Sequence, residues 1–257
     1  MEIKKDRCLK KTKRGLYVKG ETLSLSRSKV ALFLECPRSF YLDLIVGLRR
    51  PGIPAFTLNL AVDQLLKTEL DHYREIQQTH PLAAERQLNL VPFSHPDLDS
   101  WRDSLHKGIA YKDDRYNFLL RGGIDDVWID RDTNELVVVD YKATSKKEIV
   151  GLYNVYKKQM EFYQWLFRKN GYKVKDQCYF IYCNGLKQGH FNDSLKFDTN
   201  LIEYVGNTEW IEPTIQQIYD LLNQDIVPEV NMECPHCEFS YYNIESDSML
   251  SQYDGVA

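Results

Sequence analysis

Two aspartates and a lysine lie at one end of a predicted β-hairpin. Residues 119–130 and 135–142 are rich in β-branched and apolar side chains, and the four residues between them have the composition of a turn. A symmetrical turn pairs Asp125 with Asp140 across the two strands, and Lys142 then lies on the same face as Asp140. The same register pairs Val127 with Val138 and Ile129 with Leu136.

This arrangement favours a cation between the two aspartates, because like charges directly opposite each other in a ladder repel. Magnesium prefers oxygen ligands and usually takes one or two protein carboxylates together with water and phosphate. The hairpin therefore predicts a divalent-cation site at its open end. The alternative is that Asp125 and Asp140 are solvated charges at the strand ends, which Lys142 neutralises. The hairpin alone leaves both interpretations open.

The elements that position these residues follow from hydrophobic periodicity and from the places of Gly and Pro. We expect a mixed β-sheet flanked by helices, in an α/β fold with an N-terminal helical extension. Helices are predicted over residues 27–35, with Ser26 as N-cap, and over 38–46, 57–78, 101–111, 153–169 and 210–223. Further strands are predicted over 177–183 and 189–197.

Composition places the chain among ordinary globular proteins, with 43% hydrophobic and 27% charged residues. A chain of 257 residues can bury a sizeable core. No apolar run has the length needed to span a bilayer, and the charged N-terminus lacks the apolar segment of a secretory signal. We therefore expect no membrane partner, a cytoplasmic location, and cysteines that are reduced or metal-bound rather than in disulfides.

Charge is distributed unevenly along the chain. The net charge of −4 argues against a general nucleic-acid coat, yet residues 1–20 carry eight basic and two acidic side chains. A basic arm on an acidic body suits contact with phosphates, although such arms are more often simply solvated.

Five short motifs follow one another along the chain. They are Cys36-Pro37-Arg38 at the end of a helix, Gly123-Ile124-Asp125, Val138-Val139-Asp140-Tyr141-Lys142, Gln159-Met160-Glu161-Phe162-Tyr163 and Cys234-Pro235-His236-Cys237. Their types and order resemble the RecB-like branch of the PD-(D/E)XK nuclease superfamily, which includes the CRISPR-associated RecB-like exonucleases. The resemblance runs from about residue 24 to residue 240. Each motif alone is weak, and the five in this order are much more specific.

The resemblance implies a restriction-endonuclease-like core over residues 24–242, with a basic arm over 1–23 and a tail over 243–257. It implies a metal-dependent nuclease that hydrolyses DNA, as an exonuclease acting on DNA with single-stranded ends. Two alternatives stay open: a catalytically silent nucleic-acid-binding or structural module, and an enzyme acting on RNA or nucleotides with the same scaffold. The sequence does not distinguish exonuclease from endonuclease action or give the strand polarity.

The resemblance also assigns roles to the site residues. Asp125, Asp140 and the backbone carbonyl of Tyr141 would hold Mg²⁺ or Mn²⁺. Two nearby carboxylates raise the pKa of a lysine, so we expect Lys142 to act through its charge rather than as a general base. The predicted helix over residues 153–169 would contribute two further residues that orient water or substrate, Gln159 and Tyr163.

One further metal ligand is expected on the helix over residues 57–78. The resembling nucleases carry a histidine there, and the matching position in this chain is Asp63. An aspartate is a suitable ligand for a hard cation. His72 is the other candidate, and both residues are also consistent with exposed polar positions on a helix.

Three cysteines correspond in part to a second metal centre. The resembling exonucleases bind a four-iron cluster with one N-terminal and three C-terminal cysteines. Cys36 occupies the first place and Cys234 and Cys237 the next two, but no third C-terminal cysteine follows.

Three interpretations of these cysteines stay open: a degenerate iron–sulfur site, a zinc site or free thiols, with metal-free thiols ranked slightly first. A zinc site could be completed by Cys8 or His236. Cys178 and Cys183 fall in a buried strand pattern and are expected to be small core residues.

Overall fold

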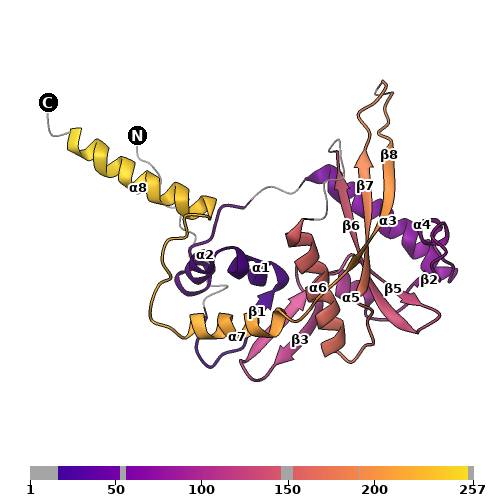
Figure 1. Cartoon of the computed structure of the whole chain (residues 1–257), viewed down its shortest axis with the longest axis horizontal. Helices are drawn as coiled ribbons and strands as arrows, with labels where there is room; N and C mark the ends of the chain where they lie inside the picture. Colours follow the sequence, from indigo (N-terminus) through magenta and orange to yellow (C-terminus); the bar gives the residue numbers. More distant parts are fainter. Residues whose placement is uncertain (1–16, 53–55, 146–152, 191, 254–257) are drawn as a thin grey trace. The chain divides into compact units, whose positions relative to one another are not determined.

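The computed structural model describes residues 17–52, 56–145, 153–190 and 192–253 (Figure 1). Most of the predicted basic arm, Cys8 included, and the last four residues of the predicted tail lie outside these ranges. The chain forms two compact units. The first comprises the N-terminal segment to Ile53, Asp114–Phe118 and the segment from Glu212, and the second comprises Pro54–Asp113 and Leu119–Ile211.

The first unit is mainly helical. Helix α1 covers the predicted residues 27–35, and Pro37 then starts the next helix, because proline is well tolerated in a first turn. Ser26 is at the N-cap of α1, but its hydroxyl lies 2.8 Å from that of Ser28 and does not cap the backbone. The elements are β1 (Leu23–Ser26), α1 (Arg27–Glu35), α2 (Pro37–Tyr41), η1 (Leu42–Val46), α7 (Ile211–Leu222) and α8 (Pro235–Tyr253).

Two helical predictions in this unit need correction. The predicted helix over residues 38–46 is a short α-helix followed by the π-helical turn η1, which ends at Gly47 with a φ of +79°. Helix α8, which the sequence did not predict, runs to residue 253 and so includes part of the predicted tail. Its apolar residues follow no helical stripe, which is why periodicity did not reveal it.

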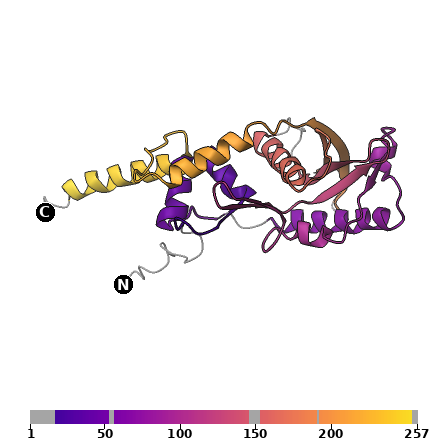
Figure 2. The ribbon, with the colours of Figure 1, turned by 90° about the horizontal axis from the view of Figure 1, so that it is seen from below.

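The second unit is built on a five-stranded mixed sheet in the order β2-β5-β6-β7-β8. The pair β6–β7 is parallel and the other pairs are antiparallel, and α6 forms the crossover that a parallel pair requires. Helices α3 and α6 lie on opposite faces of this sheet (Figure 2). The elements are α3 (Thr57–Glu75), α4 (Pro81–Ala84), β2 (Leu90–Pro92), α5 (Leu98–Arg102), β3 (Ile109–Asp113), β4 (Phe118–Gly122), β5 (Asp126–Asp130), β6 (Glu135–Thr144), α6 (Asn154–Lys169), β7 (Gln177–Gly185) and β8 (Phe197–Val205).

The core on the α3 side follows the period-two alternation of the strands. Val137, Val139 and Tyr141 of β6 pack with alternate residues of β7 against one stripe of α3. That stripe consists of Val62, Leu66 and Leu70. Residue 140 therefore faces the other side of the sheet, toward α6.

The predicted strand over residues 119–130 is two strands in two different sheets. Strand β4 pairs with β3, whereas β5 belongs to the five-stranded sheet. The break falls at Gly123, where an added Cβ would lie 2.4 Å from the Cα of Ser104, so only glycine fits. The next backbone N–H, that of Ile124, donates to the carbonyl of Trp101 at 3.1 Å instead of joining a ladder.

Two other predicted elements, a helix and a strand, lie at different residues from those we expected. The predicted helix over 101–111 ends at Arg102, and Gly108, with a φ of +80°, precedes strand β3. The predicted strand over 189–197 is replaced by β8, which starts at Phe197 and pairs with β7 along its whole length. Strand β8 is an edge strand with polar residues, and these weakened its hydrophobic signal.

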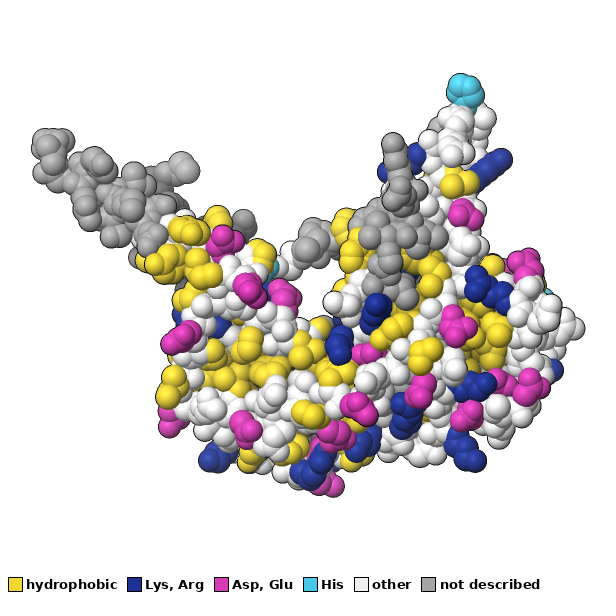
Figure 3. All heavy atoms as spheres, in the orientation of Figure 1, with side chains coloured by type: hydrophobic (Ala, Val, Ile, Leu, Met, Phe, Trp, Pro, Cys, Tyr) yellow, Lys and Arg dark blue, Asp and Glu magenta, His cyan; other side chains and the backbone are white. Residues whose placement is uncertain are grey.

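Charge on the surface is mixed. On the face that Figure 3 shows, Lys and Arg side chains are interspersed with Asp and Glu side chains. No helix in the described part of the chain is long and apolar enough to cross a lipid bilayer.

Candidate active site

The hairpin β5–β6 has the predicted register. Val127 pairs with Val138 and Ile129 with Leu136. Asp125 lies one residue before β5, and its carboxylate accepts a hydrogen bond from the backbone N–H of Tyr141 at 3.0 Å. The register therefore brings Asp125 beside Asp140, as the sequence predicted.

Asp140 is fully buried and is held from two sides. Lys142 makes an ion pair with one carboxylate oxygen. Gln159 of α6 donates to the other oxygen at 2.7 Å and lies 3.2 Å from the hydroxyl of Tyr163. The predicted set of two aspartates, a lysine, a glutamine and a tyrosine thus comes together at one place.

Burial and the nearby charge of Asp125 raise the pKa of Asp140 to about 8, although Lys142 opposes this shift. Burial lowers the pKa of Lys142, but Asp140 and Asp125 raise it by more, so the net shift is upward. Lys142 is therefore charged at neutral pH, which agrees with an electrostatic role. Its ammonium group also lies 4.9 Å from the ring centre of Tyr156.

The donor set fits a hard divalent cation. The carboxylate of Asp125, one residue before β5, lies beside that of Asp140 on β6, and Asp140 retains a proton at neutral pH because it is buried and because Asp125 repels its charge. A divalent cation would replace that proton, and the backbone carbonyl of Tyr141, which accepts a hydrogen bond from Lys142 at 3.3 Å, would supply a further oxygen.

The site opens onto a cleft of about 340 Å³. Asp125 and Lys142 line one side, and α3 contributes Asn59, Asp63 and Lys67 to the same cleft. The carboxylate of Asp63 already has a partner, because it forms an ion pair with Lys67. The Lys67 ammonium nitrogen lies 2.8 Å from a carboxylate oxygen of Asp63.

His72, the alternative to Asp63, is exposed and does not line the cleft. Of the two candidates on α3, only Asp63 therefore faces the predicted site.

A buried polar network supports the site from behind, and sequence reasoning missed it. Asp126 is fully buried and makes ion pairs with Arg74 and Arg102, and it accepts a hydrogen bond from the hydroxyl of Tyr141 at 2.7 Å. Arg102 also donates to the backbone carbonyl of Asp125 at 3.1 Å. The network therefore holds the backbone carbonyl of Asp125 and the side chain of Tyr141. The available signal was Asp126 itself, a carboxylate on the apolar face of the strand that needs a buried partner.

Tyr163 packs against a position that must be glycine. An added Cβ on Gly122 would lie 2.6 Å from the Cε1 atom of the Tyr163 ring. The adjacent Gly122 and Gly123 thus serve two purposes, since the second allows the break between the strands.

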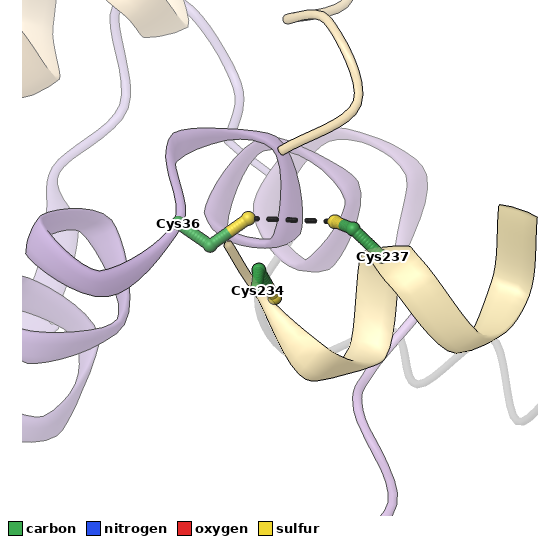
Figure 4. A group of neighbouring side chains, drawn as sticks. All are labelled: Cys36, Cys234 and Cys237. Atoms are coloured by element: carbon green, nitrogen blue, oxygen red, sulfur yellow. Dashed lines mark hydrogen bonds between the residues drawn. The ribbon is translucent and has the colours of Figure 1, made fainter. Parts of the chain in front are cut away.

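The three predicted cysteine ligands come together in the first unit (Figure 4). Cys36, Cys234 and Cys237 are buried, and their sulfur atoms all lie within 4.8 Å of one another. Burial opposes ionisation of Cys36, but hydrogen bonds from Ser39 and the other two thiols lower its pKa to about 7. Among the described residues, His236 is exposed and is not part of this group.

Comparison with known proteins identifies the family. A sequence model of the PD-(D/E)XK nuclease superfamily matches residues 24–242. The chain belongs to this superfamily, which confirms the resemblance and the α/β fold class that it implied. Membership implies a nuclease, a hydrolase that acts on nucleic acid, and members typically use divalent metals. The RecB-like branch stays a prediction.

Two further comparisons add little. No curated protein matches the chain. The crystal structure of a protein called SSO0001 is similar over 88% of this chain and 87% of that one, with 17% sequence identity and a TM-score of 0.36.

Proposed function

We propose that the protein is a RecB-like exonuclease that hydrolyses DNA phosphodiester bonds with Mg²⁺ or Mn²⁺. The observation that carries this proposal is the carboxylate pair at the end of the hairpin: buried Asp140 is ion-paired with the charged Lys142, and Asp125 and Lys142 line an open cleft. A domain that only bound nucleic acid would have no use for two converging carboxylates, because they repel both each other and phosphate.

Asp125, Asp140 and the carbonyl of Tyr141 would hold the cation. When bound, a divalent ion supplies positive charge to the phosphate and lowers the pKa of water at the site. Lys142 keeps a compact positive charge on the wall of the cleft, where it stabilises charge that develops on the phosphate.

Helix α6 positions the carboxylate of Asp140. Gln159 holds one of its oxygens and also contacts the hydroxyl of Tyr163, so both side chains can orient water or substrate beside it. Asp63 supplies a third carboxylate to the cleft, and it would become a ligand if its ion pair with Lys67 opened.

The substrate can be tested with purified protein and end-labelled oligonucleotides. We would compare linear single-stranded DNA, linear double-stranded DNA, circular single-stranded DNA and RNA, each with Mg²⁺, Mn²⁺ or EDTA. We expect short products from linear DNA with either metal, and no cleavage of the circle or in EDTA. Cleavage of the circle would contradict exonuclease action, and cleavage of RNA alone would contradict the proposed substrate.

Variants then test the site. Asp140→Ala should abolish cleavage, and Lys142→Met should lower kcat by about 100-fold or more because a preorganised charge is lost. The matched control is Asp132→Ala, an exposed carboxylate in the turn at the other end of the same hairpin, which should keep full activity. Full metal-dependent activity in Asp140→Ala would show the site assignment to be wrong. Folded wild-type protein that binds metal and DNA but cleaves nothing would favour the silent binding module.

A further inference from the structure

The thiol cluster of Cys36, Cys234 and Cys237 differs from an ordinary group of core cysteines. These three side chains form a buried apolar cluster whose members are only one another. Cys183, by contrast, packs in the main core of the sheet with aliphatic and aromatic side chains. Thiols that serve as small hydrophobic residues are expected in surroundings like those of Cys183.

The spacing of the sulfur atoms fits one metal ion better than the four-iron cluster that the resemblance implies. A tetrahedral ion with metal–sulfur bonds of about 2.3 Å holds its thiolates about 3.8 Å apart. The sulfur atoms of Cys36 and Cys237 are 3.6 Å apart (Figure 4). In a four-iron cluster each thiolate binds a different iron, so the sulfur atoms stand farther apart than those that share one ion.

The ligand count bears on both centres, because a structural zinc ion is also four-coordinate, and here its fourth ligand would be a water or a group outside the described residues. A four-iron cluster takes four thiolates. Among the residues that the structure describes, the group contains three, and no other cysteine, histidine or carboxylate joins it. The described residues therefore do not fit that cluster.

Arg50 lies beside the cluster. One terminal nitrogen of its guanidinium group is 2.9 Å from the sulfur of Cys234, and the other donates to Glu35 at 2.5 Å. The Nε atom of Arg50 is buried and has no hydrogen-bond partner. The Glu35 contact fixes the guanidinium group so that it faces the thiols.

The net charge of a site with three thiolates accounts for the arginine beside it. Three thiolates around a divalent ion leave a net charge of −1, which is costly in a buried site. A guanidinium group hydrogen-bonded to one thiolate neutralises that charge and orients the ligand, as groups that hydrogen-bond to metal ligands commonly do.

We propose that Cys36, Cys234 and Cys237 bind a single thiophilic divalent ion of the zinc class, and that Arg50 neutralises the resulting three-thiolate site. The ion ties the junction of α1 and α2 to the first turn of α8, which joins parts of the first unit that are about 200 residues apart in sequence. The role is structural, and it is independent of the proposed nuclease activity.

Metal analysis of the full chain is the first test. Protein purified from cells supplied with both zinc and iron should contain one zinc per chain and show no visible absorption. Iron with inorganic sulfide and a visible chromophore would overturn the proposal in favour of a cluster. Metal-free protein that also fails to bind added Zn²⁺ or Co²⁺ would overturn it in favour of free thiols.

Variants separate the ligands from their neighbours. Cys234→Ser should lose the zinc, and Cys183→Ser is the matched control that should keep it. If Cys234→Ser does not fold, titration of chelated wild-type protein with Co²⁺ gives the same answer, since thiolate ligation produces an intense charge-transfer band. Loss of zinc in Cys8→Ser would overturn the three-thiolate assignment.

The role of Arg50 needs a measurement of affinity. Arg50→Gln should bind zinc with the same stoichiometry but about 10- to 100-fold more weakly in competition with a chelator. The control is Arg49→Gln, at a neighbouring arginine that pairs with Asp43 and lines the same cavity as Cys237. Equal affinities for the two variants would overturn the role of Arg50.

Discussion

Cation binding at Asp125 and Asp140 should depend strongly on pH up to about pH 8. Burial and the charge of Asp125 raise the pKa of Asp140 to about 8 in the metal-free protein. A cation must displace that proton at any lower pH, so its apparent affinity falls about tenfold for each pH unit. Because Asp140 is already half deprotonated at pH 8, the expected loss between pH 8 and pH 6 is roughly 50-fold, or about 2.3 kcal/mol.

The raised pKa of Asp140 also determines how pH changes the stability of the metal-free protein. Asp140 has a folded-state pKa of about 8, above the value of about 3.9 for an unfolded chain. Its contribution to stability is therefore fully present below about pH 4 and is lost as the pH rises through 8. A saturating divalent cation should reverse this loss, because it binds only the folded carboxylates.

Isothermal titration calorimetry with Mn²⁺ measures both effects directly. Titrations at several pH values from 6 to 8.5, in two buffers of different protonation enthalpy, give the affinity and the number of protons released. We expect about one proton per ion at pH 7, and no proton release in Asp140→Asn. An affinity that stays constant from pH 6 to pH 8, with no proton released, would refute the argument from burial and charge repulsion.

Three substitutions test the structure around the site. Asp126→Ala should lower the free energy of unfolding by about 3 kcal/mol in urea titrations, because Arg74 and Arg102 then keep only the partly exposed carboxylate of Asp71, whereas exposed Asp132→Ala should change it by about 0.5 kcal/mol or less. Equal losses of unfolding free energy in Asp126→Ala and Asp132→Ala would contradict the stabilising role of the ion-pair network. Tyr141→Phe should cost about 1–3 kcal/mol through the lost hydrogen bond yet keep the Mn²⁺ affinity, since the carbonyl is unchanged; a large fall in affinity would argue against that ligand. Gly122→Ala should cost about 1–3 kcal/mol and reduce cleavage, because its Cβ collides with the tyrosine ring of α6, and Gly52→Ala, whose Cβ meets nothing within 4 Å, should do neither.

The sequence predicts the hairpin of the candidate site well because two local constraints determine its register. Alternating apolar residues and a four-residue turn allow one register, since a shift by one residue would move every side chain to the other face. The spacing of Gln159 and Tyr163 places both on one face of a helix, again from local geometry. These features depend on neighbours along the chain.

The parts that escaped prediction depend on distant partners. Gly123 breaks the long strand because of the backbone at Ser104, and neither residue type reveals that approach. Arg74 and Arg102 meet Asp126 from segments 52 and 24 residues away, with no periodic pattern linking them. Composition shows that a buried carboxylate needs a cation, but not which arginine supplies it.

The short distance along the chain between the two carboxylates has a consequence for folding kinetics. Asp125 and Asp140 are only 15 residues apart and are joined by a tight hairpin, so their contact has a low contact order. The parallel pairing of β6 with β7 must wait for α6 to cross over. The cation-binding pair can therefore form early, and there its repulsion opposes closure of the hairpin. A divalent cation that relieves this repulsion in the transition state should speed refolding, in addition to slowing unfolding.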